Sequence, residues 1–461
     1  MKASGVERDG ERLARPEQVA LADDLIDRPR AQALGERRAG RRRRSEEVRH
    51  GGLAPRWREP SMIAKSPRGG AVARTIGTIG TIGTIGLSAH RARMIPPRLI
   101  ATYAVRADAA GIAARAEALA LEQSVEVPLA AVRDARVRAE VVARVESVAR
   151  RDDGRHDVRI ALAVETVGGE AGQLMNMLFG NSSLHDDVEL CDVDLPAAAA
   201  AAFGGPRFGS AGWRAAVGAT GRPLTCSALK PLGLAPEALA ALAGTLARAG
   251  IDVVKDDHGL ADQRSAPFIA RVVAVQRAID AANRESGGRT LYAPSLTGDL
   301  DTMHASLRIA RDAGVGAVLV APMVSGVSTL AALARDAGVP ILAHPALGGA
   351  TRIAPPLLLG KLFRLFGADA TIFPNAGGRF GYSRDTCAAI ARAAREPWHD
   401  LAPTLPVPAG GMSVARVAEM RRAFGDDAMF LVGGDLLVAG GDVETRCRAF
   451  VAAVRESAEV A

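Results

Sequence analysis

The stretch GAVLVAPMVSGVSTLAALARDAGVPILAH, residues 316–344, places two short apolar runs on either side of an amphipathic segment. The runs GAVLVAP and VPILAH have the length of buried strands, and STLAALARDAG between them has the apolar spacing of a helix. A strand, a helix and a second strand in this order form a β–α–β unit with parallel strands. The stretch therefore predicts an α/β fold built on a parallel sheet.

The same alternation extends over residues 222–461. Eight short apolar runs are separated by helical segments, and the other six runs are LTCSAL, IDVVK, TLYAP, ATIFP, LPVPAG and MFLVGG. Eight consecutive strand–helix units are typical of a (β/α)8 TIM barrel. A doubly wound sheet is the alternative, although that fold usually has fewer units. We expect the barrel, as a catalytic domain over residues 216–461.

Residues 94–215 show a different pattern, in which strands and helices are mixed in a smaller unit. Apolar alternation predicts strands at residues 100–105 and 156–165, and another in VELCDVDLP. Helices are predicted in DAAGIAARAEALALEQS and GQLMNMLFGNSS. We therefore expect a small α+β domain of the ferredoxin-like kind before the barrel.

Residues 1–93 are rich in arginine and contain the tandem repeat TIGTIGTIGTIG. No apolar period there is long enough to build a core, so we expect a disordered, low-complexity extension. The positive charge of the chain, net +7, is concentrated in this segment. A basic tail can bind nucleic acid, but aromatic residues and a binding fold are missing, so no nucleic-acid partner is expected.

The cysteines and the hydropathy pattern indicate the class of protein. The four cysteines, Cys191, Cys226, Cys387 and Cys447, form no CxxC pair, which argues against a zinc ribbon and a disulfide scaffold. No stretch reaches about 18 consecutive apolar residues, so no membrane span is expected. The N-terminus lacks the apolar segment of a signal peptide. These features predict a cytoplasmic protein.

The predicted barrel indicates where catalytic residues should lie, because active sites of this fold form at the carboxyl ends of the strands. The first apolar run is followed by Lys230, and the run VPILAH ends in His344. A lysine at such a position can act as a general acid or base when burial or nearby cations lower its pKa. We expect both residues to act on the substrate, the alternative being a solvated lysine and a structural histidine.

The second run leads into AGIDVVKDDHGLADQ, where Lys255, Asp257 and His258 follow one another closely. Residues two apart on a strand point to the same side, so Lys255 and Asp257 should lie together. Carboxylate and imidazole groups suit a divalent cation. A lysine can join them only if its charge is removed, for instance as a carbamate formed with CO2. The alternative is a Lys–Asp ion pair beside a solvated histidine.

The last two runs end in glycine pairs, and Ser413 after the first pair could cap a helix. Glycines let backbone N–H groups approach an anion closely, and the loops after strands seven and eight of a barrel are the usual phosphate site. The alternative is that they are ordinary turn glycines. We expect a phosphate-binding site formed by Gly410, Gly411, Gly433 and Gly434.

At this point the sequence resembles the ribulose-bisphosphate carboxylase large-chain (RuBisCO) family, from about residue 100 to residue 454. GIDVVKDDH matches the family pattern GxDxxKDDE. Further matching segments, in the family's order and spacing, are GRPLTCSALKPLGL, LYAPSLTG, GVPILAHPALGGA, AGGRFG, PAGG and VGGD. LEQS and FGNSS match the segments that reach into the neighbouring subunit's site. The resemblance implies a homodimer with a shared active site.

The resemblance also implies roles for the residues at the predicted barrel mouth. Lys255 would be carbamylated by CO2, Asp257 would bind Mg²⁺ or Mn²⁺, and His258 stands where the family has an acidic ligand. Lys230 would move protons at the enolisable carbon, and His344 would bind the substrate. A histidine at position 258 that is not a ligand would be free to act as an acid or base.

Other implied roles concern substrate binding. Arg379 stands at the family's mobile-loop lysine, which supports addition of CO2. Glu122 and Asn181 would reach the site from the partner chain. The phosphate would be held by the backbone of Gly410, Gly411, Gly433 and Gly434.

Several departures from the family argue against CO2 fixation. KPLGL is one residue shorter than the family's KPKLGL, so a second lysine is absent. Arg379 replaces a lysine, which is not a conservative change at a catalytic amine. Ile372 replaces a histidine that contacts phosphate, and Ala409 replaces a serine. These features resemble the carboxylase-like, or form-IV, group.

The retained residues suit metal-dependent enediolate chemistry on a phosphorylated keto sugar. We expect a lyase that decarboxylates, or transcarboxylates and hydrolyses, a sugar acid such as 3-oxo-isoapionate 4-phosphate. A β-keto acid loses CO2 without help from a loop lysine, which agrees with Arg379. The alternatives are a 5-methylthioribulose-1-phosphate isomerase and a diketo-methylthiopentyl-phosphate enolase. A non-catalytic regulatory paralogue is a further alternative.

Overall fold

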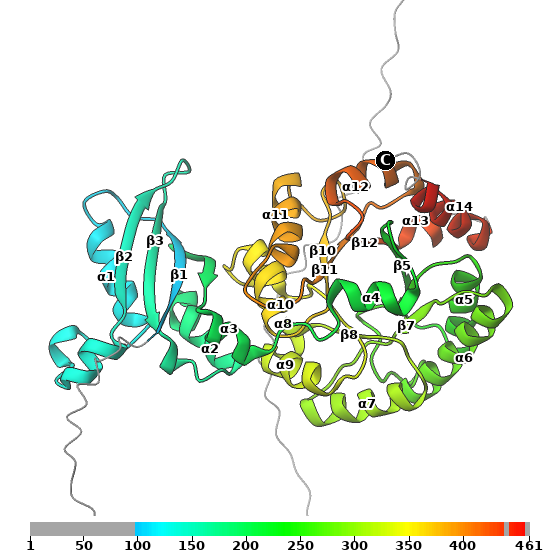
Figure 1. Ribbon diagram of the computed structural model, residues 1–461, viewed down its shortest axis with the longest axis horizontal. Coiled ribbons are helices and arrows are strands. Elements are labelled where there is room, and N and C mark those ends of the chain that lie inside the picture. Colours follow the sequence, from blue (N-terminus) through cyan, green and yellow to red (C-terminus); the bar gives the residue numbers. More distant parts are fainter. Residues whose placement is uncertain (1–96, 438–441, 457–461) are drawn as a thin grey trace, which may run out of the picture. The chain divides into compact units, whose positions relative to one another are not determined.

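The computed structural model describes residues 97–437 and 442–456 (Figure 1). The extension predicted for residues 1–93 lies outside the described residues. The first part of the described chain contains a four-stranded antiparallel sheet in the order β2-β3-β1-β4. Its elements are β1 (Arg98–Val105), α1 (Ile112–Glu122), β2 (Arg144–Arg150), β3 (His156–Ala163), α2 (Ala171–Phe179) and β4 (Val188–Asp194). This βαββαβ topology confirms the ferredoxin-like α+β expectation.

Strand β2 is an element that the sequence pattern did not predict. It lies at the edge of the sheet, paired only with β3 on one side. Only Val145 among its residues is even half-buried, and the other six are exposed. Strands that bury neither face lack the apolar alternation on which the prediction depends. An edge strand of this kind therefore leaves little trace in the sequence.

The second part of the described chain is a barrel of eight strands in the order β7-β6-β5-β12-β11-β10-β9-β8. All of its strand pairings are parallel, and a parallel bridge between Ser295 and Leu319 joins the β7 side to β8. The strands are β5 (Leu224–Leu229), β6 (Val253–Asp256), β7 (Leu291–Ala293), β8 (Val318–Val320), β9 (Ile341–Ala343), β10 (Ala370–Pro374), β11 (Leu405–Ala409) and β12 (Met429–Val432). Each predicted run is a strand, so the barrel is confirmed and the doubly wound sheet is excluded.

Helices surround the barrel strands, as Figure 1 shows. The larger ones are α5 (Pro236–Arg248), α6 (Phe268–Ser286), α7 (Leu300–Asp312), α9 (Val327–Asp336), α11 (Arg384–Arg395), α12 (Val417–Phe424) and α14 (Val443–Glu456). The short ones are α8 (Pro322–Ser325), α10 (Phe363–Leu365) and α13 (Gly434–Leu437), and a π-helical segment, Pro356–Leu362, precedes α10. In chain order, α3 (Ala197–Phe203) and α4 (Gly209–Val217) come between β4 and β5.

The interior of the barrel is filled with side chains. Alternate residues of the strands and Trp213 of α4 form one buried apolar cluster, which includes Leu224, Cys226, Val253, Ala293, Leu319, Leu342, Ile372, Val407 and Met429. Because side chains alternate along a strand, Lys255 lies on the same side of β6 as the interior residue Val253. Because apolar side chains fill the interior of the barrel, the polar groups meet at the carboxyl ends of the strands.

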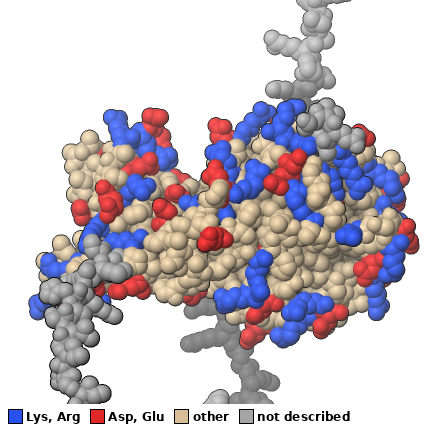
Figure 2. Space-filling model, in the orientation of Figure 1, with Lys and Arg blue, Asp and Glu red and all other residues tan. Residues whose placement is uncertain are grey.

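The described surface mixes charges of both signs. Figure 2 shows Lys and Arg interspersed with Asp and Glu over the face that it draws. Some are in contact, such as Arg115 and Asp187, with a nitrogen–oxygen distance of 2.7 Å. None of the helices within the described ranges is long and apolar enough to cross a membrane. All four cysteines are free, so no disulfide contributes to this fold.

Asp369, in the turn before β10, links α4 to the barrel. One carboxylate oxygen accepts the backbone N–H groups of Phe208 and Gly209, each at 2.7 Å, and the other accepts that of Ile341 at 2.8 Å. The residue is almost fully buried, with 2% of its surface exposed. Three backbone donors, two of them buried, therefore depend on this carboxylate.

We predict that Asp369→Ala lowers the free energy of unfolding by about 3 kcal/mol or more, because several buried N–H groups lose their acceptor. Denaturant unfolding monitored by circular dichroism measures the change. Asp312→Ala, at an exposed position that ends α7, is the control and should change stability by less than about 0.5 kcal/mol. An unfolding midpoint of Asp369→Ala equal to that of the wild type would contradict this role.

Candidate active site

The barrel mouth brings together five residues that the sequence pattern singled out. Lys230, at the end of β5, forms an ion pair with Oδ2 of Asp257, just beyond β6. Nδ1 of His258 lies 2.7 Å from Oδ1 of Asp257. The rings of His258 and His344 are stacked, with centroids 4.0 Å apart and planes 11° apart. Residues that follow the neighbouring strands β5 and β6 and the more distant strand β9 thus meet in one polar cluster.

Lys255 completes this cluster from below. Its side chain is buried, and its Nζ donates to the backbone oxygen of Asp256 at 2.9 Å. Burial lowers the pKa of Lys255, because desolvation disfavours the ammonium form, and the charge of Lys230 acts in the same direction. A lysine whose pKa is lowered is a better nucleophile at neutral pH than a solvated one. This is the property that reaction with CO2 requires.

Asp257 is the acidic centre of the cluster. Burial opposes its ionisation, but the hydrogen bond and charge of Lys230 outweigh that effect, so the pKa of Asp257 is held below its usual value. Both of its oxygens face cationic or N–H groups, Lys230 on one side and His258 on the other. The carboxylate is therefore ionised and binds its neighbours together.

The two histidines have defined tautomers. The backbone N–H of Ala346 donates to Nδ1 of His344 at 3.1 Å, and burial lowers the pKa of His344 to about 2. His344 is therefore neutral, and its proton lies on Nε2. Nδ1 of His258 faces a carboxylate and carries the proton, while burial lowers the pKa of His258 against the effect of Asp257. His258 thus has a free lone pair on Nε2.

The donors at the mouth suit a divalent cation only if Lys255 takes part. Within residues 97–437 and 442–456, no group of three or more His, Cys, Asp or Glu side chains could hold a metal ion. A carbamate on Lys255 would add a third donor to Asp257 and Nε2 of His258. Carboxylate-type oxygens with one imidazole match Mn²⁺ as well as Mg²⁺. The residues therefore fit the metal in the carbamylated state.

A buried network behind the cluster was not identified from the sequence. The carboxylate of Asp256 accepts from Nε of Arg271 at 3.1 Å, the hydroxyl of Tyr292 at 2.7 Å and the N–H of Ser295 at 3.0 Å. Arg271, on α6, also donates to the backbone oxygens of two residues in the loop after His258. This network fixes the end of β6 against β7 and α6. Its signal in the sequence is Arg271 itself, a charge at a core position of an amphipathic helix.

The glycine loops after β11 and β12 have different local reasons for glycine. Gly410 and Gly411 have φ of 92° and 64°, and a Cβ on Gly411 would lie 2.9 Å from the backbone oxygen of Gly377. These two glycines are required by the backbone itself. A Cβ on Gly433 or Gly434 would meet no atom within 4 Å, so space adjoins both. Ser413 precedes a 3₁₀ turn and makes no side-chain capping bond.

Three predicted site residues, Arg379, Glu122 and Asn181, make their contacts with residues outside the cluster. Arg379 is exposed in the loop after β10, and its guanidinium stacks on the ring of Phe380 at 5.4 Å. Asn181 donates to Glu122 at 3.0 Å, so these two are brought together on the small α+β domain. The structure thus brings Glu122 and Asn181 together as a pair on the small domain, and it leaves Arg379 outside both this pair and the cluster.

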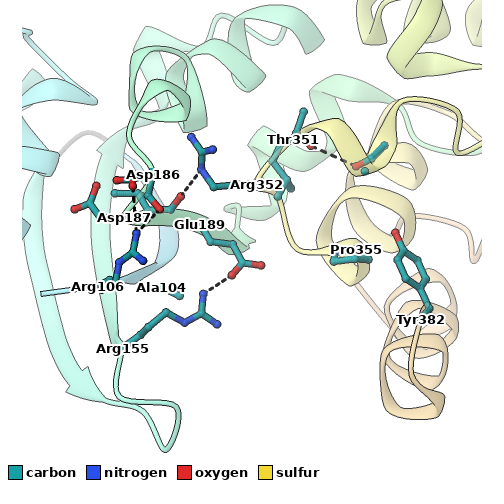
Figure 3. Close-up of a pocket in the computed structure, with 14 residues that line it drawn as sticks. Ala104, Arg106, Arg155, Asp186, Asp187, Glu189, Thr351, Arg352, Pro355 and Tyr382 are labelled. Carbon is teal, nitrogen blue, oxygen red and sulfur yellow. Dashed lines mark hydrogen bonds and ion pairs between the residues drawn. The ribbon is translucent and has the colours of Figure 1, made fainter. Parts of the chain in front are cut away.

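Two cavities lie away from the polar cluster. One, of about 470 Å³, is lined by the segment before and within β4, by residues 348–355 and by Tyr382 (Figure 3). Several of its charged side chains are paired, for example Arg155 with Glu189. The other, of about 450 Å³, lies at the amino ends of β5 to β7 and includes the ion pair of Arg222 and Asp252. Neither cavity includes a residue of the cluster at the mouth, where Lys230, Asp257, His258 and His344 converge.

Comparison with known proteins agrees with this geometry. Residues 210–440 match the family model of the ribulose bisphosphate carboxylase large chain, catalytic domain. A relative named 5-methylthioribulose-1-phosphate isomerase, from Rhodospirillum rubrum, is 54% identical over 363 residues, which is 78% of this chain and 97% of the relative. A 2,3-diketo-5-methylthiopentyl-1-phosphate enolase from Geobacillus thermodenitrificans is 36% identical over 60% of this chain and 70% of the relative.

A solved structure supports the same assignment. The crystal structure of a Rubisco-like protein from Rhodopseudomonas palustris superposes with a TM-score of 0.74 and 52% identity. The match covers 78% of this chain and 98% of that one. The motifs at the strand ends, the barrel and the near full-length relatives all lead to one conclusion. The chain belongs to the ribulose bisphosphate carboxylase large-chain family and is a RuBisCO-like protein.

Proposed function

We propose that this protein is an isomerase of a phosphorylated keto sugar, with 5-methylthioribulose 1-phosphate as the substrate. The observation that carries the proposal is the cluster of Lys230, Asp257, His258 and His344, which supplies proton-transfer groups at one point of the barrel mouth. The isomerase from Rhodospirillum rubrum, 54% identical over nearly its whole length, supports this choice of substrate.

Isomerisation removes a proton from a carbon beside the carbonyl, which gives an enediolate. A proton is then added to a different carbon of the sugar chain. No net oxidation occurs, and no other molecule is consumed. We assign the carbon proton to Lys230, which lies at the solvent-reached side of the cluster. His344 presents an Nε2–H that can donate to the substrate oxygen on which negative charge develops. Asp257 holds Lys230 and His258 in place.

The residues that would hold a metal are Lys255 as its carbamate, Asp257 and His258 through Nε2. When bound, a divalent cation would polarise the carbonyl oxygen and lower the pKa of nearby groups. We propose that the phosphate lies against the backbone of Gly410, Gly411, Gly433 and Gly434, where space adjoins the last two.

Decarboxylation of a sugar acid is the first expectation from the sequence, and it rests on the KDDH motif and Arg379. The exposed Arg379 contacts only the neighbouring Phe380 in its described interactions, and it adds no group to the cluster. Isomerisation needs no proton-transfer group beyond those of the cluster. The two relatives described above carry names of isomerase and enolase, which support proton transfer over loss of CO2. We therefore place isomerisation first.

We further propose a homodimer in which Glu122 and Asn181 complete the partner's site. These two side chains are joined to each other on the small domain, and Leu184 beside them is 85% exposed. Seven of the eleven exposed large apolar residues in the described chain lie between a barrel strand and the body of the next helix, at the catalytic end: Leu232, Ile269, Leu300, Val324, Leu347, Phe380 and Val414. Apolar surface gathered on one face is typical of an interface.

We predict that the purified protein converts 5-methylthioribulose 1-phosphate to an isomer of the same mass without releasing CO2. Phosphorus and carbon NMR follow the conversion, and 3-oxo-isoapionate 4-phosphate and 2,3-diketo-5-methylthiopentyl 1-phosphate are the comparison substrates. Ribulose bisphosphate with labelled CO2 should give no fixed label, since Arg379 replaces the loop lysine. Release of CO2 from the sugar acid without isomerisation would favour the lyase, and no turnover of any substrate would favour a binding role.

We predict that Lys255→Met lowers isomerase activity by at least about 100-fold, because the carbamate that would help to hold the cation is lost and a bound cation is worth several kcal/mol of transition-state stabilisation. With ¹³C-labelled bicarbonate, the wild type should show a carbamate carbon resonance that the variant lacks. Lys361→Met, which changes a lysine outside the cluster, is the control and should keep that resonance. Full activity in Lys255→Met would contradict the role of the carbamate.

A further inference from the structure

Leu232 lies in the loop between β5 and α5, two residues beyond Lys230, and it is 50% exposed. Its Cδ1 is 3.1 Å from the point that a Cβ on Gly259 would occupy, so it rests on the loop that carries His258. Leu234, by contrast, packs against the main apolar core. Leu232 therefore presents an isobutyl group to solvent directly beside the polar cluster.

The rest of this loop is also without charge. After Lys230 the chain reads Pro-Leu-Gly-Leu-Ala before α5 begins, and the next ionisable residue is Glu237. The charge of Lys230 is already engaged by Asp257. A phosphate or carboxylate placed against this loop would lose water without gaining a counter-charge. An apolar group placed there would lose little and would cover exposed leucine surface.

We propose that Leu232 determines specificity by forming the wall that receives an apolar substituent, a thioether or alkyl group, at the end of the sugar chain away from the phosphate. This inference rests on the proposed function and adds to it the residue that selects the substrate. The polar cluster then transfers protons at the carbons beside the carbonyl. The loop after β5 binds the part of the substrate that does not react.

The test compares two substrates that differ only in that substituent, 5-methylthioribulose 1-phosphate and ribulose 1-phosphate, which has a hydroxyl there. Leu232→Gln should lower kcat/KM for the methylthio substrate about 10-fold, within the range for loss of one apolar contact in a pocket. For ribulose 1-phosphate, kcat/KM or the inhibition constant should change less than about 2-fold. Leu129→Gln, at a half-exposed leucine of the small α+β domain that belongs to none of the proposed surfaces, should alter neither value.

A second variant tests the same wall from the opposite side. Gly259 has no left-handed backbone conformation, so alanine is sterically allowed there apart from its contact with Leu232. Gly259→Ala should push Leu232 from its place and raise KM for the methylthio substrate more than it weakens binding of ribulose 1-phosphate. Adding Leu232→Ala to Gly259→Ala should remove the steric part of that effect.

The outcomes separate this inference from the proposed function. A wild type without activity on 5-methylthioribulose 1-phosphate would overturn both. If the wild type is active, and Leu232→Gln lowers kcat/KM equally for both substrates or for neither, the role of Leu232 as the wall is overturned while the proposed function stands. A selective loss of kcat/KM on the methylthio substrate, with the Leu129→Gln values unchanged, is the result that the inference requires.

Discussion

Closure of eight parallel strands into one barrel is the constraint on which the site depends. Parallel strands that close on themselves bring all their carboxyl ends to one rim, so residues far apart in sequence must meet there. Lys230, Asp257 and His344 follow β5, β6 and β9, yet one carboxylate and one ring stack connect them. The apolar interior below, with Trp213 among its side chains, leaves no other place for these polar groups.

Within that rim, burial and charge act on each other. Desolvation lowers the pKa values of Lys255 and His344, while Lys230 keeps Asp257 ionised. The Asp256–Arg271–Tyr292 network fixes the end of β6. A mobile backbone at this point would move Asp257 and His258 and the groups that contact them. Apolar Leu232 borders the same groups from the solvent side. The site is thus a polar centre between a rigid support and an apolar wall.

The sequence predicts the barrel well because each of its eight buried strands leaves a short, mostly apolar run. It fails at β2, whose exposed edge position needs no apolar alternation. Residues at strand ends can be predicted as a group, since topology alone places them at the mouth. The alternative to a metal site is an ion pair of Lys255 with Asp257, whereas the structure pairs Asp257 with Lys230, because side-chain partners across strands depend on register and rotamers. The chemical roles of all these site residues, Arg379, Glu122 and Asn181 included, remain predictions.

The central claim is that Lys230 moves a proton at a carbon of the bound keto sugar phosphate. Proton NMR of 5-methylthioribulose 1-phosphate in heavy water measures this directly, as exchange of a carbon-bound proton for deuterium. We expect exchange with the wild type and a rate at least about 100-fold lower with Lys230→Met, because Lys230 would act as the general acid–base group. Exchange at the wild-type rate in Lys230→Met, or none with the wild type, would contradict it.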